Sequence, residues 1–259
     1  MRHALGLELV VPADLDTDVL GTFTGEVARE GTPQQVCLRK ARLGMAAAGL
    51  PLGLANEGSF GPDPLLPFVQ ADTEVMTFVD DERGLIVTEQ LVTHDTNHAQ
   101  REACGIDDLA RWLAGVRFPS HALVVLPKAP GATAPADKGI VSLDHLEQAI
   151  RRAAHASPEG VAWVRTDMRA HLNPLRMSAI RRLAFRLARR LATACPACAA
   201  PGWGLVGTVE GLPCETCAAA TRMVRAEVLG CVACPHREQT ARRDGRHLAS
   251  AGSCDYCNP

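Results

Sequence analysis

Eight of the ten cysteines in the 259-residue chain stand in four Cys-x2-Cys pairs close to its C-terminus. The pairs are Cys195 with Cys198, Cys214 with Cys217, Cys231 with Cys234, and Cys254 with Cys257. A Cys-x2-Cys turn presents two thiolates to one metal ion, and Zn²⁺ takes four such ligands in a closed tetrahedron. The spacing therefore predicts two structural zinc ions. An iron–sulfur cluster and redox dithiols are the alternatives, and they fit this regular pairing less well.

The sequence leaves open which pairs share an ion. Consecutive pairing joins Cys195, Cys198, Cys214 and Cys217 on one ion and the other four cysteines on the second, whereas interleaved pairing gives a cross-braced module. We expect consecutive pairing, because the gaps within each set fit zinc-ribbon spacing and residues 205–210 can form a strand between the first two turns. The tail has few large apolar side chains, so metal binding should supply much of its stability.

A second candidate site follows an apolar run at 50–55 that we expect to be a buried strand. The next residues, NEGSFGPDP, are rich in Gly and Pro, which predicts a loop. This loop carries Asn56, Glu57 and Ser59. Ligands of open α/β sheets bind beyond the carboxyl ends of strands, so these side chains are candidates for ligand binding or catalysis.

The segment RTDMRAHLNP is a third candidate, because it follows a predicted strand at 160–165. If the strand continues, Asp167, Arg169 and His171 lie on one side of it. A carboxylate, a guanidinium and an imidazole together can bind phosphate and metal. The alternative is a structural ion pair between Asp167 and Arg169, with His171 packed against the next helix. We predict that these three residues share one anion-binding pocket with Glu57, which would hold Mg²⁺.

Charge is distributed unevenly along the chain, although the formal net charge is only −2. Acidic residues dominate the first hundred positions, whereas residues 165–190 hold eight arginines and a single acid. Such a basic stretch is typical either of a nucleic-acid surface or of a solvated helix face. Aromatic residues make up only 4 % of the chain, which limits base stacking.

Strands alternating with helices predict an α/β or α+β sheet domain over residues 1–190, followed by a double zinc-ribbon domain over 191–259. A Pro- and Ala-rich surface loop is expected at 128–138. The expected strands cover 5–11, 50–55, 74–79, 85–89, 121–126 and 160–165, and the expected helices cover 32–48, 106–113, 142–154 and 173–192.

The apolar runs are too short for a membrane helix, and the first residues lack a signal-peptide cleavage site. We therefore expect a cytoplasmic protein whose thiols stay reduced.

The motifs NEGSFGP, TDMRAHLNP and CDYCNP together resemble a bacterial family of unknown function with a zinc-ribbon tail. This resemblance covers nearly the whole chain, and the family label implies no reaction.

The N-terminal half is also similar to nucleoside triphosphate pyrophosphatases of the inosine triphosphatase class. The similar residues are Thr22-Phe23, Glu26, Lys40-Ala41 and Asn56-Glu57-Gly58. The resemblance implies that Lys40 approaches phosphate and that Glu57 is a metal ligand or base, with Glu26, Asn56 and Ser59 nearby in the ligand site.

Three functions follow as hypotheses. The first is a divalent-metal-dependent phosphohydrolase acting on a nucleotide or a related phosphate compound. The second is a zinc protein that binds nucleic acid through the Arg-rich helix. The third is a partner-binding zinc-ribbon protein without catalytic activity.

Overall fold

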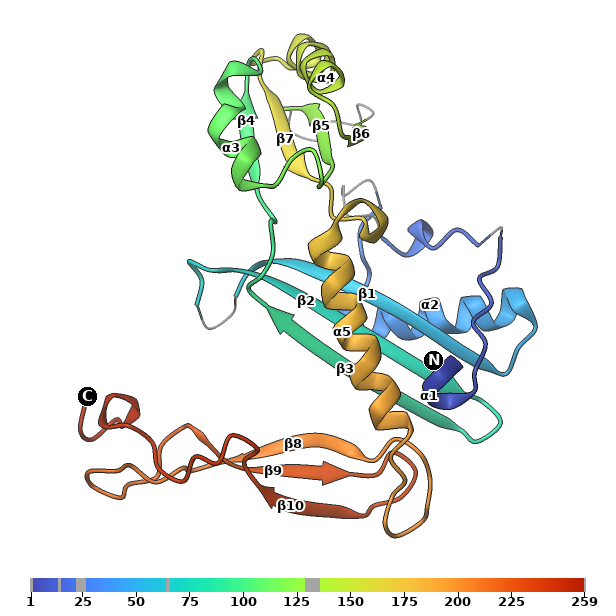
Figure 1. The fold of residues 1–259 in the computed structure, drawn as a ribbon, viewed down its shortest axis with the longest axis vertical. Helices are drawn as coiled ribbons and strands as arrows, with labels where there is room; N and C mark the ends of the chain where they lie inside the picture. The colour runs from blue at the N-terminus through green and yellow to red at the C-terminus, as the bar shows by residue number, and fades with distance from the viewer. Residues whose placement is uncertain (1, 14, 22–26, 64–65, 129–135, 259) are drawn as a thin grey trace. The chain divides into compact units, whose positions relative to one another are not determined.

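A computed structural model describes residues 2–13, 15–21, 27–63, 66–128 and 136–258. The chain divides into two compact units, whose helices and strands are labelled in Figure 1. We call residues 10–79 and 88–185 the sheet unit, and residues 1–9, 80–87 and 186–259 the ribbon unit. Helices combined with antiparallel sheets make the fold α+β, which confirms the predicted class. The expected domain boundary at residue 190 stays a prediction.

A three-stranded sheet has the order β1-β2-β3, and a short turn at 81–84 joins β2 to β3. These strands are β1 (Leu52–Pro62), β2 (Gln70–Asp80) and β3 (Leu85–Thr93). Helix α2 (Pro33–Ala48) packs on this sheet through Ala41 and Met45, which meet Val79. Thr32 caps the start of the helix, close to the expected start, and its capping box with Gln35 provides hydrogen bonds for backbone N–H groups of the first turn.

Strand β1 corrects one expectation, because it runs through NEGSFGP and does not end before it. Gly and Pro usually form loops, but here glycine allows close packing inside a strand. At Gly58 a Cβ atom would lie 2.6 Å from Arg176 Nη2 and 2.8 Å from Glu74 Oε1. A side chain cannot fit beside that buried pair, so the position requires glycine.

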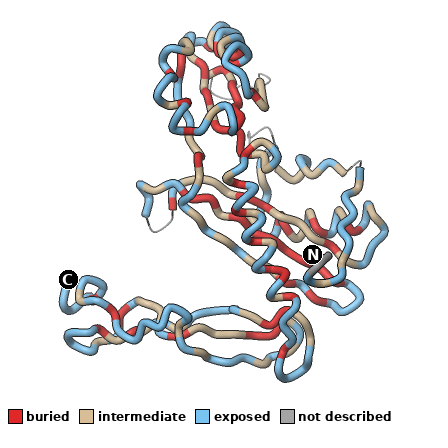
Figure 2. The backbone as a smooth tube through the Cα atoms, in the orientation of Figure 1, coloured by how far each residue is buried: buried red, intermediate tan, exposed pale blue. Residues whose placement is uncertain are grey.

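A four-stranded antiparallel sheet has the order β4-β7-β5-β6. Helices α3 and α4 cover one face of it, and the buried residues gather there in Figure 2. The core includes Leu113 and Ile150 from the helices and Val125 and Val164 from the strands. The elements are β4 (Gln100–Ala103), α3 (Ala110–Gly115), β5 (Leu123–Pro127), β6 (Asp137–Ile140), α4 (Leu143–Ala156) and β7 (Ala162–Thr166). Most of the expected 128–138 loop lies outside the described residues.

Helix α5 (Pro174–Leu191) confirms the predicted long helix, and its first turns bury a charged side chain. Arg176 donates from Nε to Glu74 Oε1 on β2 at 2.6 Å, and both side chains are almost fully buried. Asn56 donates to the other Glu74 oxygen at 2.6 Å. Strand β2 is therefore buried on both sides, with α2 packed on one and Arg176 bonded to its Glu74 on the other.

The ribbon unit contains a three-stranded antiparallel sheet of order β10-β9-β8. Its strands are β8 (Gly204–Glu210), β9 (Val224–Gly230) and β10 (Arg237–Ala241). Most of its side chains are exposed or half-buried, and the buried ones lie next to the cysteine turns (Figure 2). This burial pattern agrees with the expectation that the tail lacks a large apolar core and needs another source of stability.

The N-terminal expectation is wrong. Residues 5–11 form no strand, and a short helix α1 (Arg2–Leu5) precedes them instead. Leu9, Val10 and Val11 are exposed, so the apolar run joins no sheet. None of the helices within the described ranges combines the length and the apolar character needed to cross a bilayer.

Candidate metal centres and an arginine-lined cavity

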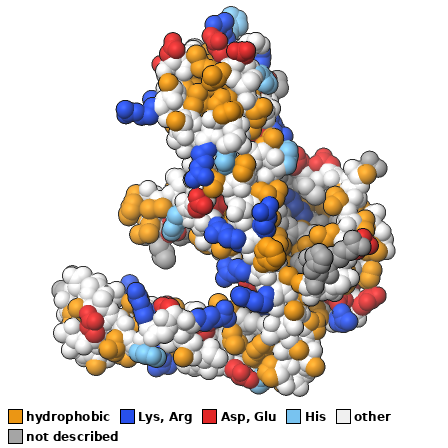
Figure 3. All heavy atoms as spheres, in the orientation of Figure 1, with side chains coloured by type: hydrophobic (Ala, Val, Ile, Leu, Met, Phe, Trp, Pro, Cys, Tyr) orange, Lys and Arg blue, Asp and Glu red, His pale blue; other side chains and the backbone are white. Residues whose placement is uncertain are grey.

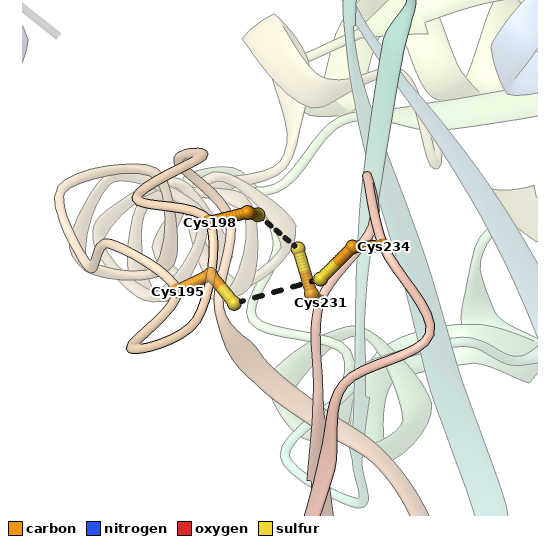
Figure 4. Close-up of side chains that lie close together, drawn as sticks. All are labelled: Cys195, Cys198, Cys231 and Cys234. Carbon is orange, nitrogen blue, oxygen red and sulfur yellow. Dashed lines mark hydrogen bonds between the residues drawn. The ribbon is translucent and has the colours of Figure 1, made fainter.

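The eight paired cysteines form two groups, and the pairing is interleaved. Cys195 and Cys198 meet Cys231 and Cys234, as Figure 4 shows, and Cys214 and Cys217 meet Cys254 and Cys257. These are the eight cysteines predicted to be zinc ligands, but the expected consecutive pairing is wrong.

The ribbon explains why the pairing is interleaved. In the β8–β9 register Gly204 lies opposite Gly230, so the turn before β8 and the turn after β9 lie at the same end. The second turn follows the far end of β8, where Glu210 lies opposite Val224. Seven residues of strand span about 23 Å, which is far beyond the reach of one zinc ion. The strand proposed to link the first two cysteine turns is therefore what separates them.

The sulfur atoms in each group lie at separations that suit one tetrahedral ion. In the first group Cys195 and Cys234 are 3.9 Å apart, and Cys198 and Cys231 are 3.6 Å apart. The second group repeats these values, with 3.9 Å between Cys214 and Cys257 and 3.6 Å between Cys217 and Cys254. Zn–S bonds of about 2.3 Å in a tetrahedron put sulfurs about 3.8 Å apart. The two groups could therefore hold two zinc ions.

At two of the eight cysteines, Cys214 and Cys231, backbone N–H groups favour the thiolate form that a metal requires. Hydrogen bonds from the N–H groups of Cys217 and Thr216 lower the pKa of Cys214 to about 7. At Cys231 burial raises the pKa, yet the N–H groups of its own turn and neighbouring thiols outweigh burial and bring the pKa down to about 6. Ala233 makes one of these contacts, with its nitrogen 3.2 Å from the Cys231 sulfur.

The sheet unit carries a cavity of about 340 Å³ on the face of the four-stranded sheet that α3 and α4 leave uncovered. Four of its lining residues form one row across the strands. Gln100 lies opposite Arg165, Arg165 opposite Val124, and Val124 opposite Lys138. Directly opposed residues in antiparallel strands point to the same face. The core-facing residues Val125 and Val164 alternate with this row and point to the helices.

Arg165 is half-buried, and the structure gives its guanidinium no carboxylate partner within the described ranges. Its Nε is buried without a hydrogen-bond partner, and its guanidinium carbon lies 5.9 Å from the Trp163 ring centroid. Burial lowers the pKa of Arg165, and burial together with the Arg165 charge lowers the pKa of His98, which also lines the cavity. His98 is therefore neutral at pH 7.

Asp167 and Arg169 both line the cavity, and Asp167 fixes the direction of the arginine. Asp167 is buried, and its oxygens accept from Arg169 Nε at 3.0 Å and from Arg169 Nη2 at 2.6 Å. The Gly139 N–H also donates to Asp167 Oδ2, at 3.2 Å. Strand β7 ends at Thr166, so the expected alternation of Asp167, Arg169 and His171 does not occur. His171 lies in a short 3-10 helix, is exposed, and does not line the cavity.

Glu57 is buried between two cations and is not part of the cavity wall. Its Oε1 lies 2.6 Å from Arg29 Nη2, and its Oε2 lies 2.7 Å from Lys40 Nζ. Arg29 also donates to the Gly58 carbonyl at 2.6 Å and reaches the cavity. Glu57 therefore orients Arg29 towards the cavity, and both of its oxygens already face cations.

The remaining predicted ligand residues have different surroundings. Ser59 lines the cavity, whereas Asn56 donates to the buried Glu74. Glu26 lies outside the described residues. Within those residues, the only groups of three or more potential metal ligands are the two cysteine groups, so no carboxylate cluster suited to Mg²⁺ accompanies the cavity.

Sequence reasoning missed Arg165, Lys138 and Gln100. The run AWVRT does carry a signal for Arg165, because Ala162 and Val164 alternate with larger polar or aromatic residues. That alternation predicts one face towards a core and one face carrying Trp163 and Arg165. The cross-strand register that aligns Arg165 with Lys138 depends on long-range pairing, and no local pattern contains it.

The fold and these sites define an α+β protein with two four-cysteine groups of the zinc-ribbon kind. A family described as "Domain of unknown function (DUF6671)" matches residues 40–259, and the chain belongs to this family. Searches among curated proteins and among solved structures gave no match to the chain. Membership of an uncharacterised family was predicted, and the resemblance to inosine triphosphatase-like enzymes stays a prediction.

Proposed function

We propose that this chain is a zinc-binding protein in which two Zn²⁺ ions, one at each end of the ribbon, hold the C-terminal module together. The sulfur separations of 3.6–3.9 Å within both groups carry this proposal, because they suit the tetrahedral edge of a four-thiolate zinc site.

Both ions would have a structural role. Four thiolates complete the coordination of each zinc, so no position remains for an activated water. The core at the first site is small, consisting of Trp203 packed with Cys195 and Cys231, and Trp203 also stacks on His236 at 5.2 Å between ring centroids. Metal binding is then the main source of folding free energy for this module.

Two double variants that each remove two thiolates test the proposal and its pairing together. Cys198→Ser with Cys231→Ser removes ligands from a single site, so the purified full chain should retain one zinc. Cys198→Ser with Cys217→Ser removes one ligand from each site, so both ions should be weakened and little zinc retained. Consecutive pairing predicts the reverse order.

Zinc per chain would be measured by elemental analysis after purification without added metal, with Cys104→Ser as the matched control. Cys104 is exposed and belongs to neither group, so this variant should keep two zinc ions, as the wild type should. A folded wild-type chain without zinc, or with stoichiometric iron, would contradict the proposal.

The phosphohydrolase hypothesis requires a set of acidic ligands for a divalent cation. Glu57 is engaged by Arg29 and Lys40, and Asp167 by Arg169. We therefore leave hydrolysis out of the proposed function.

Nucleic-acid binding is a second candidate, and the clustering of basic side chains in the ribbon unit favours it. They gather over the last turns of α5 and the adjoining ribbon strands in Figure 3. Arg186 and Arg189 of α5 and Arg225 of β9 are exposed, as a phosphate-binding surface requires. The Arg-rich stretch is not one surface, however, because Arg165 lines the cavity and Arg176 is buried.

A further inference from the structure

The cavity of the sheet unit has a positively charged lining. Among the described residues, four cationic side chains reach it, namely Arg29, Lys138, Arg165 and Arg169, against the two carboxylates Asp18 and Asp167. These cations come from three separate segments of the chain, so the fold itself brings them together. Gathering like charges costs free energy, and a bound anion is the usual compensation.

Two of these cations are held in place before any ligand binds. Asp167 receives the Nε and Nη2 groups of Arg169, and Glu57 receives Arg29. The backbone also fits around Asp167, because Gly139, at φ +74°, donates its N–H to the same carboxylate. Preorganised donors bind an anion without further loss of side-chain entropy.

Arg165 differs from its neighbours, because its buried Nε has no partner in the described part of the chain. This guanidinium Nε–H has lost water without gaining a hydrogen bond, which is unfavourable. Phosphate oxygens accept bidentate hydrogen bonds from such a fork.

We propose that this cavity binds a small organic phosphate, with Arg165 as the central ligand-binding residue and Arg169, Lys138 and Arg29 around it. No divalent cation is needed, because the described side chains of the lining carry an excess of two positive charges. A phosphate dianion matches this excess and offers three oxygens to several donors, whereas a single carboxylate offers two oxygens and one charge. The volume of about 340 Å³ suits a small molecule.

The other residues that line the cavity indicate what kind of organic group the ligand carries. The Phe60 and His98 rings lie 5.8 Å apart between centroids and both line the cavity, together with Val124 and Met168. His98 is neutral, so this side of the cavity suits an apolar or ring-bearing group.

Isothermal titration and thermal unfolding of the zinc-loaded full chain test this proposal. The probes are inorganic phosphate, glycerol phosphate, adenosine monophosphate and citrate, with NaCl matched for ionic strength. We expect saturable binding of at least one phosphate ester, with or without MgCl₂. Arg165→Gln should weaken that binding about 10- to 100-fold, because charge-assisted hydrogen bonds are lost.

Arg181→Gln is the matched control, because Arg181 is exposed on α5 and does not line the cavity. It should bind the phosphate ester as the wild type does. If Arg165→Gln fails to fold, Lys138→Gln tests the proposal in its place. Lys138 lies in the same cross-strand row as Arg165, and its replacement should weaken binding at least severalfold. The proposal is overturned if no phosphate compound binds saturably, if binding requires Mg²⁺, if citrate binds more tightly, or if the cavity variants bind like the wild type.

Discussion

Replacing Asp72 by Asn should stabilise the protein at neutral pH, which is unusual for a change to a buried polar residue. Asp72 lies on β2, is almost fully buried, and its Oδ1 has no hydrogen-bond partner within the described chain. Burial, followed by the negative charge of Glu74, raises the pKa of Asp72 from 3.8 to about 7. The protonated form can also hydrogen-bond to Glu74, and the Asn amide keeps that donor.

The direction of the effect follows from proton binding. Between pH 3.8 and pH 7 the folded chain holds a proton on Asp72 that the unfolded chain has released. The free energy of unfolding therefore falls as pH rises through this window and levels off above it. At 1.36 kcal/mol per pH unit the full loss is about 4 kcal/mol, and about 2 kcal/mol of it falls between pH 5.5 and pH 8.

Urea unfolding of the zinc-loaded chain at pH 5.5, 6.5, 7.2 and 8 measures this difference directly. The stability of Asp72→Asn relative to the wild type should grow by about 2 kcal/mol over the series and stop growing above pH 7. Glu82→Gln removes an exposed carboxylate at the β2–β3 turn and should show no such trend. A difference that does not change with pH, or a variant less stable than the wild type at pH 8, would refute the reasoning.

Two further changes test other parts of the structure. Arg176→Met should lower the free energy of unfolding by about 3–5 kcal/mol, because it leaves the buried Glu74 carboxylate without its cation. Adding Glu74→Gln should recover part of that loss, and urea unfolding of the two variants would show whether it does. If nucleic acid is the partner, Arg186→Glu with Arg189→Glu should weaken binding to short DNA or RNA duplexes severalfold and flatten its salt dependence. No binding by the wild type at low salt in a fluorescence-anisotropy titration would remove that candidate function.

Local patterns predicted most of the helices and the cysteines that come together in the two groups. The Thr32-Pro33 start of α2 and the Asn173-Pro174 start of α5 are determined by residues adjacent in sequence, as helix caps usually are. The eight cysteines are recognisable for the same reason, because each turn is complete within four residues.

Properties that depend on distant pairing were not predictable in this way. The grouping of the cysteine pairs follows from which end of β8 lies next to which end of β9, and spacing alone does not determine this. The cavity also depends on distant pairing, because strand register and a turn after β7 bring Arg165, Lys138 and Arg169 together. Glu57 stood out in the sequence as an acid in a polar segment, but its burial beside Arg29 and Lys40 depends on tertiary packing.

If zinc fills both cysteine groups as we propose, their interleaving couples the two sites thermodynamically. The chain enclosed by Cys195 and Cys234 overlaps the chain enclosed by Cys214 and Cys257, and the shared part contains β9. The first ion to bind, at either end, must order this shared strand and bears the entropic cost. The second ion finds the strand already ordered and does not bear that cost again. Each ion should therefore raise the affinity for the other by the same factor, since such coupling is reciprocal. Zinc uptake by the metal-free chain would then be cooperative, with singly loaded protein scarce during the titration.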